Sequence, residues 1–174
     1  MKLTKTERWI LSNQYRILEA LYPHEAASFA EKREALESGY ELEYSQMSQH
    51  IYDDEDTLSG TECREVIEIL SMFRSLNDAY SNLKDKKGVD KMDIQFVGFD
   101  GNSPIEVKYL SYARFFCESG GGRFSELRRG NLFNSHHSTL DIYRRMLDEW
   151  EKSSKKYELS KEDVLRISKA RIFK

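Results

Sequence analysis

One stretch of the chain, 61–83, is apolar over most of a helical circumference and contains no glycine or proline. Its apolar residues form two adjacent stripes at three- and four-residue spacing: Cys63, Val66, Ile67, Leu70, Phe73 and Tyr80, then Ile69, Met72, Leu76, Ala79 and Leu83. A narrow polar face is left for Arg64, Glu68, Ser71, Arg74, Ser75 and Asp78. A helix this apolar is buried by neighbours on at least two sides. We expect a central helix about 35 Å long.

The residues before this helix predict three shorter helices. Thr4 and Glu7 fit a capping box at the start of an amphipathic helix that ends before Pro23. A mostly polar helix is expected over 24–38, followed by Gly39, and a short third helix over 41–52.

The only strand-like stretch, 92–99, follows the central helix, and its apolar residues alternate imperfectly. A single strand has no partner of its own within the chain. We therefore expect an extended arm near 94–99 that either packs on the helices or pairs with its copy in another subunit.

Three more helices are predicted in the last third, over 105–118, 139–152 and 161–172, the last one capped by the run from Ser160 to Asp163. The connecting segment 119–138 exceeds the usual length of a featureless loop, which marks it as functional, mobile or locally structured.

The pattern as a whole predicts an all-α fold, a multi-helix bundle around a long central helix at about 61–83 with one short extended arm near 94–99. A chain of 174 residues can bury a sizeable core, and we expect a single helical domain over 1–174. Two prolines and nine glycines supply too few turns for an all-β fold.

Composition favours a cytoplasmic protein. No apolar run approaches the roughly 18 residues of a membrane span, and the start of the chain lacks the apolar region of a secretory signal. Cys63 and Cys117 are too few for a disulfide framework and fall on apolar stripes, so we expect both to be buried thiols.

Charge is unevenly distributed along the chain. Residues 1–60 carry 12 acidic and 6 basic side chains, whereas residues 104–174 carry 10 acidic and 15 basic ones. The basic residues are interleaved with acids, which favours a solvated helix surface or an acidic-to-basic subunit contact over a nucleic-acid interface. Nucleic-acid binding through the basic C-terminal third stays open as an alternative.

Candidate chemistry gathers on the GFDGN turn (98–102) and the long loop. The turn precedes a helix N-terminus, which favours an anion, and the glycine run before Arg123 could wrap a small anionic group. Histidines in the loop titrate near neutral pH. The candidate ligand-binding residues are Asp100, Asn102, Tyr112, Arg114, Arg123, Asn134 and His136, with His137 next to them. A purely structural role, in which these residues cap turns and form ion pairs, is the alternative.

Other site classes fit the sequence poorly. The loop SGGGRFSEL lacks the lysine and spacing of a phosphate-binding Walker motif. The acidic run 53–56 fails the calcium-loop spacing, and adjacent His136 and His137 point too far apart on a regular element to share one zinc ion. No metal and no cofactor are expected.

Seven segments spread over nearly the whole chain carry a family resemblance: LSNQY (11–15), ESGYELEY (37–44), ECREVIEIL (62–70), FVGFDGN (96–102), YLSYARF (109–115), FNSHHSTLDIYRRMLDEW (133–150) and LSKEDVLRI (159–167). Together, and in this order, they resemble the YfbU family. The resemblance implies a small, mostly helical bacterial protein of unestablished activity. Some relatives look like fusions to a helix-turn-helix, which implies a ligand- or partner-sensing module.

Taken together, these observations predict a homo-oligomeric sensing or interaction module. It would bind a small anionic ligand or a protein partner near the GFDGN turn and the Arg/His loop. An enzyme that uses His136 as general base, oriented by Asp100 or Asp141, is the alternative.

Overall fold

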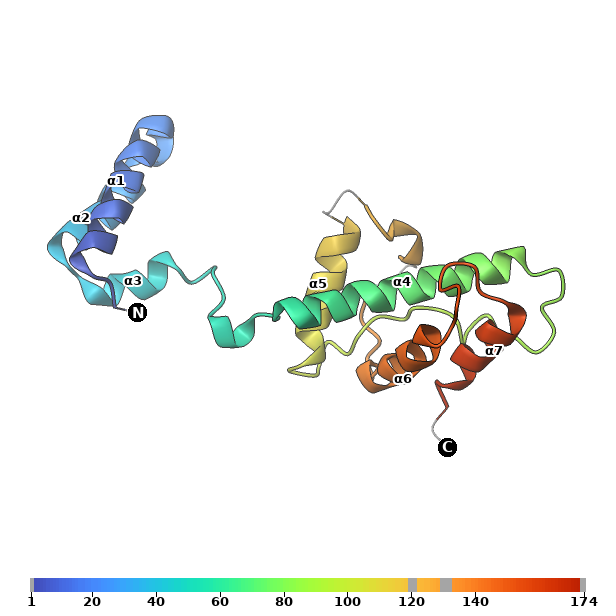
Figure 1. Cartoon of the computed structure of the whole chain (residues 1–174). Helices are drawn as coiled ribbons and strands as arrows, with labels where there is room; N and C mark the ends of the chain where they lie inside the picture. Colours follow the sequence, from blue (N-terminus) through green and yellow to red (C-terminus); the bar gives the residue numbers. More distant parts are fainter. Residues whose placement is uncertain (1, 119–121, 129–132, 173–174) are drawn as a thin grey trace. The chain divides into compact units, whose positions relative to one another are not determined.

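The computed structural model describes residues 2–118, 122–128 and 133–172. Its helices, in chain order, are α1 (Lys5–Leu21), α2 (Ala26–Ser38), α3 (Glu41–Met47), α4 (Gly60–Asn82), α5 (Glu106–Glu118), α6 (Leu140–Glu151) and α7 (Lys161–Lys169), with short 3-10 turns η1 (Pro23–Glu25), η2 (Asp54–Asp56) and η3 (Ser125–Leu127) (Figure 1). These ranges contain no strand, so the predicted all-α fold is confirmed.

The chain divides into two compact units, unit 1 (residues 1–55) and unit 2 (residues 56–174), which are described separately. The single domain over 1–174 stays a prediction. None of the helices in the described ranges has the length and apolar composition that crossing a membrane requires.

Unit 1 is a pair of helices, α1 and α2, followed by the short α3. The predicted capping box of Thr4 and Glu7 starts α1, and Gly39 closes α2 in the left-handed conformation with φ +79°. The turn η1 makes α2 begin at Ala26, two residues later than predicted, and α3 ends at Met47 rather than 52.

Ion pairs and ring contacts join α1 and α2, with the Phe29 ring of α2 lying 6.2 Å from Tyr15 and 6.3 Å from Tyr22. Glu19 of α1 pairs with Arg33 of α2 at 2.7 Å, and Arg16 of α1 pairs with Glu37 at 2.9 Å. Among the described residues of this unit, the buried hydrophobic side chains are only Ala35, Leu36 and Tyr44.

The long helix α4 is the centre of unit 2. Ser59 and Glu62 form its capping box, and the helix begins at Gly60, one residue earlier than predicted. Both apolar stripes are covered within the unit, because α5, η3, α6 and α7 all pack on α4. Ser75 was expected on the polar face but is buried. Its hydroxyl donates to the carbonyl of Ser71 at 2.9 Å, which satisfies its polar atom inside the core.

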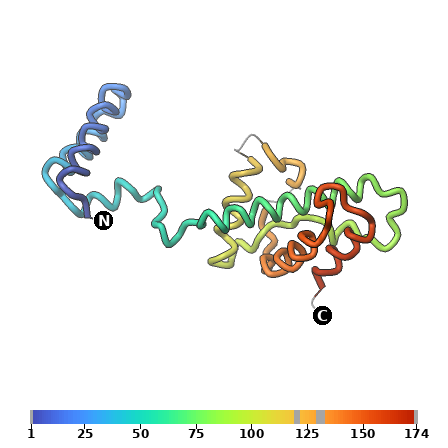
Figure 2. Tube along the Cα trace, in the orientation of Figure 1, coloured from blue at the N-terminus to red at the C-terminus, as the bar shows by residue number. Residues whose placement is uncertain are grey.

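The extended arm lies in the core of unit 2, so the first of its two predicted alternatives is confirmed. The segment runs back along α4 (Figure 2), and Ile94, Phe96 and Phe99 are buried. The ring of Phe96 lies 5.5 Å from the ring of Phe73 on α4.

The expectation that the arm has no partner within the chain is wrong. Phe99 forms a parallel bridge with Asn134, in which the Phe99 N–H donates to the carbonyl of Phe133 at 2.9 Å and the Ser135 N–H donates to the carbonyl of Phe99 at 3.0 Å. A two-bond bridge of this kind depends on residues about 35 positions apart, so local alternation could not reveal it.

Tyr143 of α6 fastens the arm from the other side. Its hydroxyl donates to the Gly98 carbonyl at 3.0 Å and accepts from the Val97 N–H at 3.2 Å. Burial raises the pKa of this phenol to about 12, so it stays protonated and keeps its donor at physiological pH.

The two cysteines differ in environment. Cys117 is buried, as predicted, and burial raises the pKa of its thiol to about 11, with the nearby carboxylates of Glu126 and Glu118 contributing. Cys63 is only half-buried, because it lies in the first turns of α4, where the helix is less covered.

Candidate functional site

Four of the predicted site residues meet at one corner of unit 2, where the turn 100–102 lies against the segment 134–136. The Asn134 side-chain oxygen accepts from the Gly101 N–H and from the His136 N–H, both at 3.0 Å. The Asp100 carboxylate accepts from the Asn102 N–H at 3.0 Å and from the Asn102 side chain at 3.2 Å. The polar groups of this corner thus satisfy one another.

The centre of the corner is Glu106, a residue that sequence reasoning missed. Its side chain is buried, and its carboxylate accepts from the Thr139 N–H at 3.1 Å, the Leu140 N–H at 3.2 Å and the Asp100 N–H at 2.9 Å. The Ser138 and Thr139 hydroxyls also donate to it. Glu106 therefore ties the turn before α5 to the start of α6.

This carboxylate occupies the position of an anion at the N-terminus of α6, where free N–H groups and the helix dipole favour negative charge. Burial alone would raise the pKa of Glu106, but the hydrogen bonds from Asp100, Ser138, Thr139 and Leu140 outweigh it and lower the pKa below its ordinary value. The Glu106 carboxylate is thus ionised and caps the N-terminus of α6.

A sequence signal for Glu106 did exist. Ser103 precedes it by three residues, the spacing of a capping box. The Ser103 hydroxyl does accept from the Glu106 N–H, at 3.3 Å. The carboxylate, however, turns to α6 instead of back to Ser103, so the local pattern would have assigned it the wrong partner.

Arg123 and Tyr112 lie away from this corner, toward the C-terminal end of α5. The Arg123 guanidinium lies over the ring of Phe116 at 5.7 Å and over the ring of Phe124 at 4.9 Å. Tyr112 lies next to Phe116, with ring centroids 5.9 Å apart. The structure therefore brings Tyr112 and Arg123 to one flank of α5.

Arg114 lies on a different flank of α5. At about 100° per residue, Arg114 is roughly 160° from both Tyr112 and Phe116 around the helix axis. Helix geometry thus places Arg114 on a different flank of α5 from the one where Arg123 stacks on Phe116, which does not favour one anion site held by both arginines. The seven predicted residues divide into three places.

The flank with Arg123 carries a continuous set of rings, the aromatic row, made of Tyr112, Phe115, Phe116 and Phe124. Centroids along the row are 6.4 Å apart for Tyr112 and Phe115, which are nearly parallel at 22°, and 6.0 Å for Phe116 and Phe124. Phe115 is 58% exposed, whereas Phe124 is buried.

A second arginine fixes the buried end of the row. The guanidinium of Arg74, from α4, lies 4.0 Å from the centre of the Phe124 ring and pairs with Glu126 of η3. Phe124 adopts a left-handed conformation, with φ +70°, and is held by rings and cations from three elements. Neither Arg74 nor Phe124 was identified from the sequence, because their contact joins residues 50 positions apart.

The histidines of the loop are exposed. His136 has φ +56°, and in the described ranges its ring has no hydrogen bond with Asp100 or Asp141. Asp141 lies near Arg144 instead, at 3.8 Å. The His137 ring nitrogen Nδ1 is 2.7 Å from the Ser135 carbonyl. An enzyme that uses His136 as general base stays a prediction, and this geometry does not place Asp100 or Asp141 where either would orient the His136 ring.

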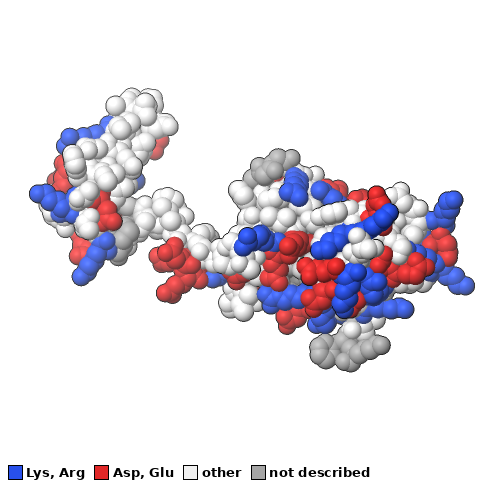
Figure 3. Space-filling view, viewed as in Figure 1, with Lys and Arg blue, Asp and Glu red and all other residues white. Residues whose placement is uncertain are grey.

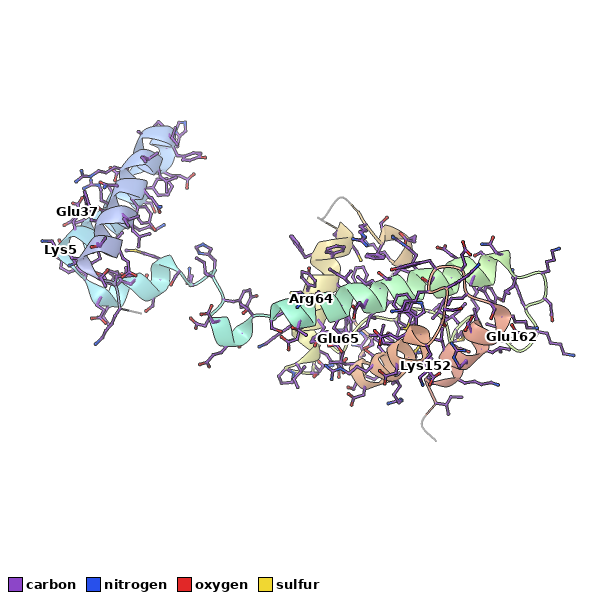
Figure 4. The ribbon with its side chains drawn as sticks, viewed as in Figure 1. Lys5, Glu37, Arg64, Glu65, Lys152 and Glu162 are labelled. Carbon is purple, nitrogen blue, oxygen red and sulfur yellow. The ribbon has the colours of Figure 1, made fainter. Side chains whose placement is uncertain are left out.

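A second polar cluster, also missed, links three helices. Arg144 of α6 donates to both carboxylate oxygens of Glu65 on α4 (labelled in Figure 4), at 2.7 and 3.0 Å, and the Tyr109 hydroxyl of α5 donates to Glu65 at 2.7 Å. Arg144 lowers the pKa of Glu65, while burial and the Glu65 carboxylate raise the pKa of Tyr109. The cluster is a bidentate structural ion pair.

Several basic residues of the C-terminal third are paired with acids of the same third. A groove of about 500 Å³ between α6 and α7 contains Arg166, which pairs with Glu149 and Asp163 at 3.2 and 2.8 Å, and Lys152, which also pairs with Glu149. Acidic and basic residues alternate over this surface in Figure 3. Nucleic-acid binding stays a prediction that these contacts do not favour.

In the ranges that the structure describes, no three His, Cys, Asp or Glu side chains gather into a metal site. The predicted glycines 120 and 121 before Arg123 lie outside the described residues.

Comparison with known proteins agrees with the resemblance noted in the sequence. The model of the YfbU domain matches residues 1–170. A UPF0304 protein of Methanocaldococcus jannaschii is 38% identical over 175 aligned residues, which cover 97% of this chain and 99% of the relative. The match therefore includes both compact units, the corner around Glu106 and the aromatic row. The chain belongs to the YfbU family.

Proposed function

We propose that this YfbU-family chain is a homo-oligomeric ligand-binding module that holds a small anion bearing a flat apolar group on the aromatic row beside Arg123. One observation carries the proposal. The exposed guanidinium of Arg123 is positioned by two rings, and no acid in the described part of the chain pairs with it.

The chemistry of the side chain suits an anion. A guanidinium that stacks on a ring through its face keeps its N–H donors at the edge, where a carboxylate or phosphate can accept two of them. Arg74 lies over the same Phe124 ring but is paired with Glu126, so its charge is already neutralised. Of these two arginines, Arg123 is therefore the one that can bind an external anion.

The aromatic row supplies the flat contact. The exposed Phe115 ring continues the row beyond Tyr112, and ring faces favour stacking with planar groups. The corner around Glu106 contributes rigidity rather than ligand contacts, because its carboxylates and amides already bond to each other.

The first test compares AMP, inorganic phosphate and adenosine by isothermal titration calorimetry. AMP combines the anion with the flat group, so it should bind more tightly than either part. Arg123→Ala should weaken AMP binding by about ten-fold or more, because charge-assisted hydrogen bonds contribute about 1.5–3 kcal/mol. Phe115→Ala should weaken AMP binding and leave phosphate binding nearly unchanged.

Arg128→Ala is the matched control, since Arg128 is an exposed arginine of the same segment that pairs with Glu118 at 3.6 Å. It should bind AMP like the wild-type chain. Equal AMP affinities for the wild-type, Arg123→Ala and Arg128→Ala proteins would show that this face is not the site.

A further inference from the structure

The first helix carries an exposed apolar surface that unit 1 does not cover. The α1 stripe, made of Ile10, Ile17 and Leu21, has exposed fractions of 50, 59 and 65%. Its members are spaced by seven and four residues, so they fall within about 40° of one another around the helix. Gln14 lies between Ile10 and Ile17, and the stripe contains no charged residue.

Unit 1 needs this surface to be covered. Its buried hydrophobic side chains are Ala35, Leu36 and Tyr44, far fewer than a folded unit of about 55 residues requires to offset the entropy of ordering its chain. The ion pairs between α1 and α2 are partly exposed and contribute little each. Burying the α1 stripe would add the missing apolar contacts.

We infer that the α1 stripe is the contact between two copies of this chain, packed as an antiparallel pair of α1 helices. This inference gives the homo-oligomer of the proposed function its interface. In an antiparallel pair centred between residues 15 and 16, Ile10 faces Leu21 of the second copy and Ile17 faces Gln14. The stripe is therefore complementary to itself about a two-fold axis, as an interface between identical copies must be.

Charge favours the same occupant. Unit 1 carries 11 acidic and 6 basic residues, and nine of the acids follow α1, on η1, α2, α3 and the segment 53–55. On α1, Arg16 and Glu19 already pair with residues of α2. The α1 stripe itself contains no charged side chain, so two acidic units can meet there without placing like charges directly against each other.

The stripe forms the centre of a dimer contact rather than all of it. Ile10, Ile17 and Leu21 together expose on the order of 300 Å² per copy, against about 800 Å² per partner in a standard interface. Trp9 and Tyr22, 67 and 53% exposed, lie about 100° from the stripe on its two sides, so each contacts the second copy only at the edge. Aromatic residues are enriched in protein interfaces.

Light scattering of the full chain tests the inference. The wild-type protein should have twice the mass of one 20.5 kDa chain, about 41 kDa, at micromolar concentration, and Ile17→Glu should reduce the mass to that of one chain. Ile105→Glu is the matched control, because Ile105 is 62% exposed on unit 2 and outside the stripe. It should leave the dimer intact.

Cross-linking tests the arrangement without relying on a destabilising charge. Under mild oxidation Gln14→Cys should give a covalent dimer, since residue 14 lies next to the two-fold axis. Thr6→Cys should not, because an antiparallel pair separates the two copies of residue 6 by roughly 28 Å. The unmodified chain, with Cys63 and Cys117, is the control for both.

A wild-type mass of one chain, or a dimer that survives Ile17→Glu, overturns the inference. Equal cross-linking at positions 6 and 14 excludes the antiparallel pair. The ligand site is tested separately: Ile17→Glu should keep the AMP binding of Arg123, and Arg123→Ala should keep the dimer mass, so either proposal can fail without the other.

Discussion

Replacing Gly98 by alanine is expected to lower the free energy of unfolding of unit 2 by about 3 kcal/mol or more. Gly98 has φ +93°, and a Cβ atom placed there would lie 2.0 Å from the carbonyl oxygen and 2.2 Å from the carbonyl carbon of Phe133. Both atoms belong to the backbone, so no side-chain rotation can relieve the clash.

The clash between an alanine at position 98 and Phe133 would weaken several hydrogen bonds at once. The Phe133 carbonyl accepts from the Phe99 N–H, and the Gly98 carbonyl accepts from Tyr143 and from the Thr139 hydroxyl at 2.8 Å. Moving Gly98 away from Phe133 would loosen the arm from α6. Urea unfolding followed by Trp150 fluorescence, in a Trp9→Phe background, would report the change in midpoint.

Gly60→Ala is the matched control for this prediction. Gly60 starts α4, and a Cβ atom there would meet no atom within 4 Å. Alanine restricts the unfolded chain and favours the helix, so the free energy of unfolding should stay unchanged or rise by up to about 1 kcal/mol. A similar loss for both substitutions would contradict the strain assigned to Gly98.

Glu106→Gln is expected to destabilise unit 2 by about 3 kcal/mol at neutral pH. The substitution keeps the shape of the side chain but replaces one carboxylate oxygen with a donor that faces the N–H groups of Asp100, Thr139 and Leu140. Buried donors left without an acceptor, and the loss of charge-assisted bonds, together account for this magnitude. Glu68→Gln, on the exposed face of α4, should change stability by less than about 0.5 kcal/mol.

Acid should remove the difference between the wild-type and Glu106→Gln proteins. The folded state lowers the pKa of Glu106 below 4.5, so its ionised form stabilises the fold above the pKa of the unfolded chain. That contribution is lost as the pH falls through the lower, folded-state pKa. Urea unfolding should give a constant difference at pH 6–8 and a shrinking one below about pH 4.5. If the difference in the free energy of unfolding between the two proteins does not depend on pH, Glu106 is not ionised in the folded state.

The helices of this chain were predictable because their signals are local. Thr4 with Glu7 and Ser160 with Asp163 form the capping boxes that the sequence indicates, since each box needs only residues three positions apart. The end of α3 was not predictable from the sequence. Tyr44 is the only buried side chain of α3, so exchanging its last helical turn for other turns changes the free energy of folding little.

The site was less predictable because its contacts are non-local. The sequence placed Asp100, Asn102, Asn134 and His136 in one set, and the structure does bring them together. Their meeting point, Glu106, was missed since its partners lie 32–34 residues away.

The two arginines of the predicted site diverge because the rotation of α5 about its axis depends on what the helix packs against. Ala113 and Cys117 face the core, which sends Arg114 and Tyr112 to opposite flanks. A list of polar residues in sequence order carries no information about that rotation.

The reactivity of the buried Cys117 thiol can be used to measure local unfolding around α5. With its pKa near 11, about one molecule in ten thousand carries the reactive thiolate at neutral pH, and the packed α5 excludes a reagent. A thiol-specific dye should therefore label the half-buried Cys63 first and Cys117 only when α5 detaches from α4. A ligand bound on the aromatic row, which includes residues of the same helix, should lower the labelling rate of Cys117. Ligand binding could then be followed by this rate without any probe introduced by mutation.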